Sequence, residues 1–223
     1  DACRLRWQRT AAIPHARRMG PDPPPPNEPP TKADIDACRR CDLGAKATQG
    51  VDGEGASRPY LMLVGEQPGN DEDLRGRPFV GPAGKLLRQM MAEAKIPFTR
   101  VYITNAVKHF SFELRGKRRI HKTPLQRHIA ACQVWLEREL AGLRPRVIVA
   151  LGATALRAVL GRALPVGRAR GQDLALPDGT RVFATYHPSA LLRAPDPESA
   201  AKLRALVLTD LRRAYEAATR GKA

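Results

Sequence analysis

Three polar residues that suit acid–base and hydrogen-bonding chemistry each follow a short apolar run. Glu66 comes after LMLVG, Asn105 after VYIT and His187 after VFATY. Apolar runs of this length fit strands that are buried on both faces, as in a parallel sheet. Because parallel strands end at one edge, where ligands bind, we expect the three side chains to meet in a crevice.

The segment after the first of these strands has the composition of a functional loop. It runs GEQPGNDEDLRGRPFVGPAG between a strand expected at 60–64 and a helix that begins near Pro82. Its glycines permit a tight turn and a close approach to a ligand, which puts Glu66 and Gln67 at the end of the strand. Loops of this length in compact domains are usually functional. The alternative is an ordinary connection whose polar residues face water.

The cysteines indicate metal binding more than disulfides. Cys38 and Cys41 have the C-x-x-C spacing at the end of a helix, which fits zinc, an iron–sulfur cluster or a redox pair. Cys132 lies on the apolar face of a helix expected at 124–143. Cys3 belongs to the N-terminal tail, where we expect it to have no role in the site.

The remaining periodicities predict one α/β domain. A capped helix begins after Thr31, with Asp34 as its capping partner. Strands and helices then alternate, which favours a three-layer α/β/α fold with a central four-stranded parallel sheet. The expected strands are 60–64, 101–103, 147–151 and 182–186, and the later helices are 82–91, 124–143, 153–160 and 197–219. We expect 111–124 to be a long basic loop and 162–180 a hairpin or irregular excursion.

Composition sets the partner class. The 223 residues contain 38 lysines and arginines against 22 acidic residues, a net charge of +16. Such a surface favours a polyanion, with nucleic acid first and an anionic membrane second. No apolar run is long enough to span a bilayer and no signal peptide is visible, so we expect a soluble cytoplasmic protein. Residues 1–31 are basic and proline-rich, as in a tail or linker, and 32–223 form the domain, which we expect to be monomeric.

Several motifs together resemble one enzyme superfamily. VGEQPG, GRPFVGPAG, NAVKH and YHPSALLR, in this order, are similar to uracil-DNA glycosylases, close to the iron–sulfur family-four members. The basic string KRRIH is similar to the X-type subgroup, whose members link covalently to uracil-containing DNA through a histidine. The resemblance covers residues 34–215. It implies the uracil-DNA glycosylase fold, a role in DNA repair by base excision, and uracil-containing DNA as partner, with single strands preferred.

The resemblance implies roles for the crevice residues. An enzyme that acts on a base flips it into a pocket, stacks it on an aromatic ring and reads its edge. Phe79 is the expected stacking ring, and the Asn105 amide pairs with uracil O4 and N3–H. His187 donates a hydrogen bond to the departing uracil, Glu66 stabilises the sugar cation or orients a nucleophile, and Gln67 lies beside the substrate. The alternatives are core packing for the phenylalanine and a turn for the asparagine.

His121 is the expected nucleophile. By the resemblance its imidazole attacks C1′ of the sugar and leaves a covalent protein–DNA bond. The other basic-loop residues, Lys117, Arg118 and Arg119, together with Ser189, are expected to contact DNA. One alternative is a conventional glycosylase in which water attacks C1′ and the histidine contacts phosphate. Another is a catalytically silent DNA-binding module.

The resemblance also implies a ligand set. Cys38, Cys41, His109 and Cys132 would hold a [4Fe-4S] cluster, with His109 at the position where family-four members have cysteine. Imidazole replaces thiolate at some iron–sulfur centres. Zinc remains an alternative, because three cysteines and a histidine suit it too. The sequence departs from the X-type pattern at Asn70, where an aspartate is expected.

Overall fold

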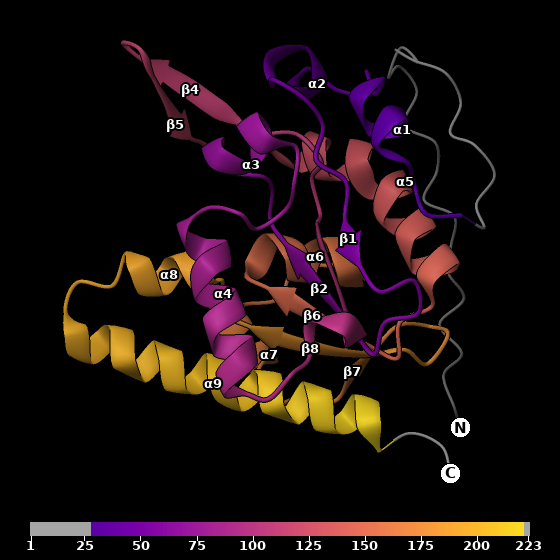
Figure 1. Ribbon diagram of the computed structural model, residues 1–223, viewed down its shortest axis with the longest axis vertical. Helices are drawn as coiled ribbons and strands as arrows, with labels where there is room; N and C mark the ends of the chain where they lie inside the picture. The colour runs from indigo at the N-terminus through magenta and orange to yellow at the C-terminus, as the bar shows by residue number, and fades with distance from the viewer. Residues whose placement is uncertain (1–27, 221–223) are drawn as a thin grey trace.

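A six-stranded sheet forms the centre of the computed structural model, which describes residues 28–220 (Figure 1). Its strand order is β1-β3-β2-β6-β8-β7. The strands are β1 (Glu54–Gly55), β2 (Leu61–Gly65), β3 (Val101–Asn105), β6 (Val147–Leu151), β7 (Leu174–Ala175) and β8 (Arg181–Thr185). The N-terminal part of the expected tail, with Cys3, lies outside the described residues.

The four central strands are parallel and the two edge strands are antiparallel to their neighbours. Leu61 lies beside Val101 on one side and Val147 on the other, so the three strands start and end together. The predicted α/β fold with a central parallel sheet is confirmed. The four parallel strands are the four that were predicted. The two antiparallel edge strands were not predicted, because they have two residues each and are too short to leave an apolar pattern.

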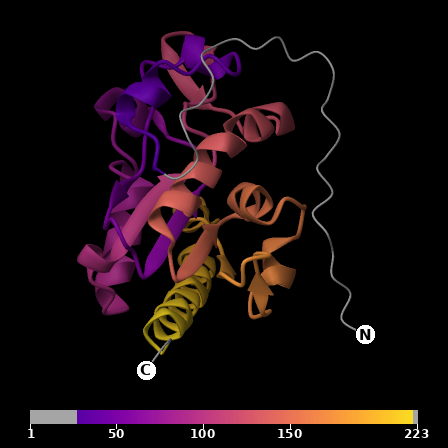
Figure 2. The same cartoon turned by 90° about the vertical axis from the view of Figure 1, so that its right-hand side faces the viewer.

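Helices cover both faces of the sheet, as the strand side chains require. Met62 and Val64 pack into one apolar cluster with residues of α5 and α6, whereas Leu61 and Leu63 pack into another with α4 and α9. The long α9, yellow in both views, lies along one side of the molecule (Figures 1 and 2). The helices are α1 (Lys32–Asp36), α2 (Leu43–Lys46), α3 (Asn70–Arg75), α4 (Pro82–Glu93), the 3-10 turn η1 (Phe98–Arg100), α5 (Gln126–Leu143), α6 (Ala153–Leu160), α7 (Val166–Ala169), α8 (Pro188–Leu192) and α9 (Pro197–Thr219).

The segment predicted as a basic loop is instead a β-hairpin that projects from the domain (Figure 1). Its strands are β4 (Phe112–Arg115) and β5 (Arg118–His121), joined by a turn at Gly116 with φ of 59°. Four-residue strands rich in arginine lack the apolar alternation by which strands are identified. The hairpin therefore gives His121 a defined position on a strand, paired with Phe112.

Other expectations hold at the level of single elements. The backbone N–H of Asp34 donates to the Thr31 hydroxyl at 3.2 Å, and the Thr31 N–H donates to the Asp34 carboxylate at 2.8 Å, which completes the capping box at α1. The 162–180 segment does include a hairpin strand, since β7 pairs with β8. None of the described helices is both long and apolar enough to cross a bilayer.

Candidate active site

The carboxyl edge of the central strands brings the polar residues of the crevice together. Glu66 directly follows β2, Asn105 ends β3, and His187 lies two residues beyond β8. The Ala106 N–H donates to the Gly65 carbonyl at 2.9 Å, which continues the pairing of β2 and β3 past the strand ends. This edge therefore presents three side chains of different chemistry from three parallel strands.

Gly65 is required because two side chains pass close over its α-carbon. A Cβ at this position would lie 2.4 Å from Asn105 Oδ1 and 2.5 Å from Phe79 Cζ. Asn105 is buried, and its Oδ1 has no hydrogen-bond partner among the described residues. An unpaired buried carbonyl oxygen is costly in a folded protein, so this amide is available to a ligand.

Phe79 has an unusual backbone conformation at the same place. Its φ is 54°, in the left-handed region that bulky residues seldom adopt. The first turn of α4 packs against this backbone, because a Cβ at Gly84 would lie 1.9 Å from the Phe79 carbonyl oxygen. The Phe79 ring centroid is 5.9 Å from that of His187, with 32° between the ring planes. Strain of this kind is concentrated at functional sites.

His187 is a neutral hydrogen-bond donor. The Ser189 backbone N–H donates to its Nδ1 at 3.2 Å, so the ring proton lies on Nε2. The Ser189 hydroxyl is also 2.8 Å from Nδ1. Burial, together with the charges of Arg193 and His121, lowers the pKa of His187 to about 4. The ring thus offers an N–H to a developing negative charge without carrying a charge itself.

Glu66 faces the hairpin histidine. Its Oε1 lies 3.5 Å from His121 Nε2, and its Oε2 accepts a 2.6 Å hydrogen bond from the Thr154 hydroxyl. Half of the His121 side chain is exposed, at 51%. Thr154 lies in the first turn of α6, just past the end of β6. Sequence reasoning missed this threonine, although the rule that polar residues follow parallel strands applies to β6 as well.

Gln67 contacts the base of the hairpin on both sides. Its Nε2 donates to the backbone carbonyls of Ser111 at 3.1 Å and Lys122 at 3.2 Å, and its Oε1 accepts from the Ser111 N–H at 3.1 Å. The side chain is buried, so these bonds occupy its amide. Gln67 therefore fixes where the hairpin leaves the domain, one residue away from Glu66.

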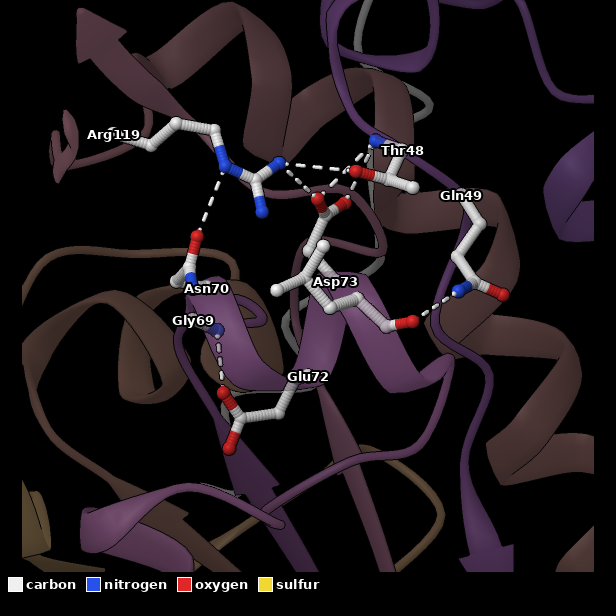
Figure 3. A network of polar contacts seen from close by, with 8 residues as sticks. Thr48, Gln49, Gly69, Asn70, Glu72, Asp73 and Arg119 are labelled. Atoms are coloured by element: carbon white, nitrogen blue, oxygen red, sulfur yellow. Dashed lines mark hydrogen bonds and ion pairs between the residues drawn. The ribbon is translucent and has the colours of Figure 1, made fainter. Parts of the chain in front are cut away.

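The Arg119 guanidinium donates hydrogen bonds to Thr48, Asn70 and Asp73, as Figure 3 shows. Its Nε donates to Asn70 Oδ1 at 2.9 Å, and its Nη1 donates to the Thr48 hydroxyl at 3.0 Å and to the Asp73 carboxylate. The guanidinium also lies 5.2 Å from the centre of the Phe112 ring. Asp73, fully buried, also accepts from the Thr48 N–H. The network joins the hairpin to α3.

The loop before α4 is stabilised by one acidic residue. Glu72 accepts from the Gly69 N–H at 3.0 Å and from the Gly81 N–H at 2.8 Å, so it bridges the two ends of the loop that carries Phe79. Figure 3 includes the first of these bonds.

Lys117 and Arg118 lie exposed at the hairpin turn, unlike Arg119.

The three described cysteines come from α5 and the segment between α1 and α2. Trp135 donates its indole N–H to Cys38 Sγ at 3.4 Å. Burial raises the pKa of the Cys132 thiol to about 12, and the nearby Cys41 and Cys38 raise it as well. The backbone N–H of Lys108 donates a hydrogen bond to the Cys132 sulfur and opposes this shift. Burial raises the pKa of Cys41 as well. The sulfurs thus already accept N–H hydrogen bonds, as thiolate ligands do.

His109, the fourth expected ligand, lies near the same part of the chain. Burial lowers the pKa of His109 to about 4, which leaves a neutral imidazole able to bind a metal. A Cβ at Gly44 would lie 3.6 Å from His109 Cε1 and 2.4 Å from the Cys38 carbonyl, so the start of α2 passes close to both residues. Within residues 28–220 no three acidic, cysteine or histidine side chains converge on a point for a single metal ion. Three thiols and one imidazole are donor types that iron–sulfur clusters use.

Comparisons with known proteins show a family relationship over most of the chain. The model of the family "Uracil DNA glycosylase superfamily" matches residues 53–212. The chain is 38% identical to a type-4 uracil-DNA glycosylase of Thermotoga maritima over 181 residues, 81% of this chain and 88% of that protein. It is 36% identical to the type-4 enzyme of Archaeoglobus fulgidus over 169 residues, 73% and 81% of the two chains. For the type-4 enzyme of Sulfurisphaera tokodaii the identity is 34% over 194 residues, 81% and 85%. The chain therefore belongs to the uracil-DNA glycosylase superfamily.

Proposed function

We propose that this protein excises uracil from DNA and then captures the sugar through a covalent bond to His121. As a member of the superfamily, it is a glycosylase that cleaves an N-glycosidic bond. The observation that carries the covalent part is the 3.5 Å separation of His121 Nε2 and Glu66 Oε1 at the mouth of the crevice. A carboxylate so close to the imidazole can hold the ring in place and stabilise the imidazolium that forms when its nitrogen attacks C1′.

Recognition of the base is assigned to Phe79 and Asn105. The flipped uracil stacks on the Phe79 ring, whose backbone conformation is fixed by α4. The unpaired Asn105 Oδ1 accepts from uracil N3–H, and the amide NH₂ donates to O4. Cytosine carries a donor where uracil has O4 and an acceptor where uracil has N3–H, so the same amide disfavours it.

Departure of uracil is assisted by His187. As the bond between C1′ and N1 breaks, its electron pair leaves with the base, and the Nε2–H of His187 donates to O2 of the anion. The positive charge that develops on the sugar is stabilised by the Glu66 carboxylate, which Thr154 orients. Neither step requires a change in the protonation state of His187.

Capture then needs one further bond. The lone pair on Nε2 of neutral His121 attacks C1′ on the face that uracil has left. The product is an N-alkylated imidazolium, whose charge lies beside Glu66. The uracil anion takes a proton from solvent. Because the bond between His121 and C1′ is not hydrolysed, each protein molecule reacts once.

The competing proposal, a conventional turnover enzyme, differs only in the group that attacks C1′. The relatives compared above carry the name of type-4 uracil-DNA glycosylases, and water is the nucleophile in this reading. The experiment is to incubate the protein with a labelled single strand that carries one uracil and to run a denaturing gel after boiling in detergent. A shifted band, absent with His121→Ser although uracil is still released, supports capture.

Two other results of that gel contradict the proposal. Free uracil with multiple turnovers and no shifted band assigns the reaction to water. Absence of both uracil release and a shifted band supports a DNA-binding protein without catalytic activity. A matched duplex measures the proposed preference for single strands, in which a base is flipped without breaking a pair. Lys117 and Arg118 at the hairpin turn, together with Ser189 beside His187, are proposed to contact the phosphates of the strand.

We also propose membership of the X-type subgroup. The hairpin carries KRRIH, and Gln67 occupies the position of a small residue in ordinary family-four members. Asn70 is the departure from the X-type pattern, and it accepts a hydrogen bond from Arg119 at 2.9 Å. An aspartate at this position would accept the same bond with a full negative charge. Adduct formation by this protein is therefore expected to be retained but slower than in Asn70→Asp.

Cys38, Cys41, His109 and Cys132 are proposed to hold a [4Fe-4S] cluster. When bound, the cluster supplies a structural link between the segment that follows α1, the end of β3 and α5. Protein purified without oxygen should be brown, with iron and acid-labile sulfide in a ratio near one, whereas a colourless protein with one zinc per chain would contradict the assignment.

A further inference from the structure

The opposite edge of the sheet carries a second cationic site. At the amino ends of the central strands lies a cavity of about 630 Å³, lined by Tyr60 and four exposed arginines. These are Arg58, Arg100, Arg144 and Arg146. None of the described residues that line it is acidic. Four cations around one cavity repel one another unless an anion lies between them.

Strand register explains why three of the side chains lie side by side. Tyr60, Arg100 and Arg146 each directly precede one of three adjacent parallel strands. The Tyr60 N–H donates to the Arg100 carbonyl at 2.8 Å, and the Val147 N–H donates to the Tyr60 carbonyl at 3.1 Å. The guanidinium carbons of Arg100 and Arg146 lie 4.5 Å and 3.9 Å from the centre of the Tyr60 ring. Arg100 precedes β3 and Arg146 precedes β6, which flank β2 on its two sides. The Tyr60 ring stabilises the two guanidinium groups.

Arg144 is held in a backbone conformation that glycine would adopt more easily. It ends α5 with φ of 48° and ψ of 60°, in the left-handed region. Glycine is the usual residue at such a helix end, because it has no Cβ. Residues held in strained conformations are concentrated at binding sites. The arginine side chain at this position lines the cavity and adds a positive charge that glycine would lack.

We propose that this arginine pocket binds the phosphate groups of a nucleic-acid strand outside the catalytic crevice. Two arginines already lie over the Tyr60 ring, which leaves the ring less available to stack on a base, so the pocket recognises phosphate rather than sequence. Five-residue strands separate the two edges by about 17 Å. The pocket therefore contacts a different segment of DNA from the one whose base is flipped. The inference uses the proposed function only for the presence of DNA.

The test uses a labelled oligodeoxythymidine strand without uracil. Affinity is measured by fluorescence anisotropy over a range of salt concentrations for wild type and for Arg58→Gln/Arg144→Gln. Loss of two phosphate contacts should reduce the slope of log Kd against log salt by about 1.4 for single-stranded DNA. The matched control, Arg162→Gln/Arg212→Gln, removes the same charge from exposed positions outside the pocket and should change the slope less. Equal slopes in the two double variants would overturn the proposal.

Two further measurements separate the pocket from the crevice and from folding. When a short uracil-containing strand fills the crevice, the wild-type protein should still bind some of the labelled thymidine strand. The Arg58→Gln/Arg144→Gln variant should bind none of it under the same conditions. Arg144→Gly should raise the Tm, because it relieves the left-handed conformation, and yet weaken binding of the thymidine strand. Complete competition by the short strand would contradict a separate site.

The source of the phosphate is distinguished by small ligands. If inorganic triphosphate binds in a way that depends on Arg58 and Arg144, while the DNA slope of the pocket variant is unchanged, the ligand is a free phosphate compound and the nucleic-acid proposal fails. Uracil release from the short strand should be the same in wild type and the pocket variants. If the wild-type protein releases no uracil, the proposed function is refuted, whereas the measurement of DNA binding by the pocket stays valid.

Discussion

At the scale of single residues, the crevice depends on a missing side chain as much as on those present. Gly65 has no Cβ, and this allows the Asn105 amide and the Phe79 ring to approach to within 3 Å of where a Cβ would lie. The glycine was visible in the sequence as a turn residue after a strand. The reason for it, a close approach from two distant segments, follows only from the fold.

Gly65→Ala should therefore reduce uracil excision without unfolding the protein. The new methyl group would displace the amide or the ring, and misplacement of a substrate-binding group by about 1 Å reduces rates about 100-fold. Single-turnover release of uracil measures the effect. Gly167→Ala is the control, since its nearest neighbour would be the Tyr186 hydroxyl at 3.4 Å. Equal rates for the two variants would mean that substrate does not use this part of the crevice.

His187 should make stability depend on pH. Its pKa falls from 6.5 to about 4 in the folded protein, chiefly by burial. Between these values the unfolded chain binds more protons than the folded one, so the free energy of unfolding decreases as pH falls through this window. The slope from one such group is at most about 1.4 kcal/mol per pH unit. Urea unfolding from pH 4 to 7 should show a smaller slope for His187→Gln, and an unchanged slope would contradict the lowered pKa.

At the scale of elements, the hairpin and the two short edge strands are parts that the sequence patterns did not predict. Helix α9 was predicted with its observed bounds, and the central strands to within a few residues, because burial imposes a clear apolar pattern on them. Strands β4 and β5 contact only each other in their small sheet, so no such pattern exists. Their stability comes from polar contacts to α3 and to the loop after β2, which join residues more than 40 positions apart.

Gln67→Ala should separate capture of the sugar from excision of the base. The substitution leaves the Ser111 N–H and two carbonyls without their partner, so the hairpin and His121 become less well positioned. We expect adduct formation to fall about 10-fold while uracil release continues. Amide hydrogen exchange over residues 111–122 should increase. The exposed Gln172→Ala is the control.

The opposite result has a clear meaning. If Gln67→Ala abolishes uracil release and leaves hydrogen exchange of the hairpin unchanged, then the amide contacts the substrate, as the sequence resemblance implied. The two readings therefore differ in both measurements.

At the scale of the whole molecule, a buried ion pair links the sheet, α5 and the cysteine site. Lys108 and Glu139 are both fully buried, with Lys108 Nζ 2.8 Å from each carboxylate oxygen. Thr104 donates to the same carboxylate at 2.9 Å. The Lys108 backbone in turn donates to Cys132 and accepts from the Val51 N–H. The sequence motif NAVKH gave no sign of this, because a lysine is expected at the surface.

Lys108→Met should destabilise the whole domain. Burial raises the pKa of Glu139, and the lysine opposes this shift by favouring the charged carboxylate. Removal of one partner leaves a buried carboxyl group without its counter-charge, which costs about 3–5 kcal/mol. Chemical unfolding measures the loss. Lys108→Met/Glu139→Leu removes both charges and should recover much of the stability, since replacing a buried ion pair by apolar residues is often neutral.

The cysteine site can show whether the Lys108–Glu139 pair supports the core alone or the cysteine site as well. Because the Lys108 main chain contacts both Cys132 and the segment before β1, loosening the pair should also loosen whatever the cysteines bind. Visible absorbance per chain, measured on freshly purified protein, should fall in Lys108→Met and return in the double variant. If stability falls while absorbance does not, the ion pair supports the core alone, and the cysteine site is held by the contacts that Trp135 and the backbone of α2 make to its sulfurs.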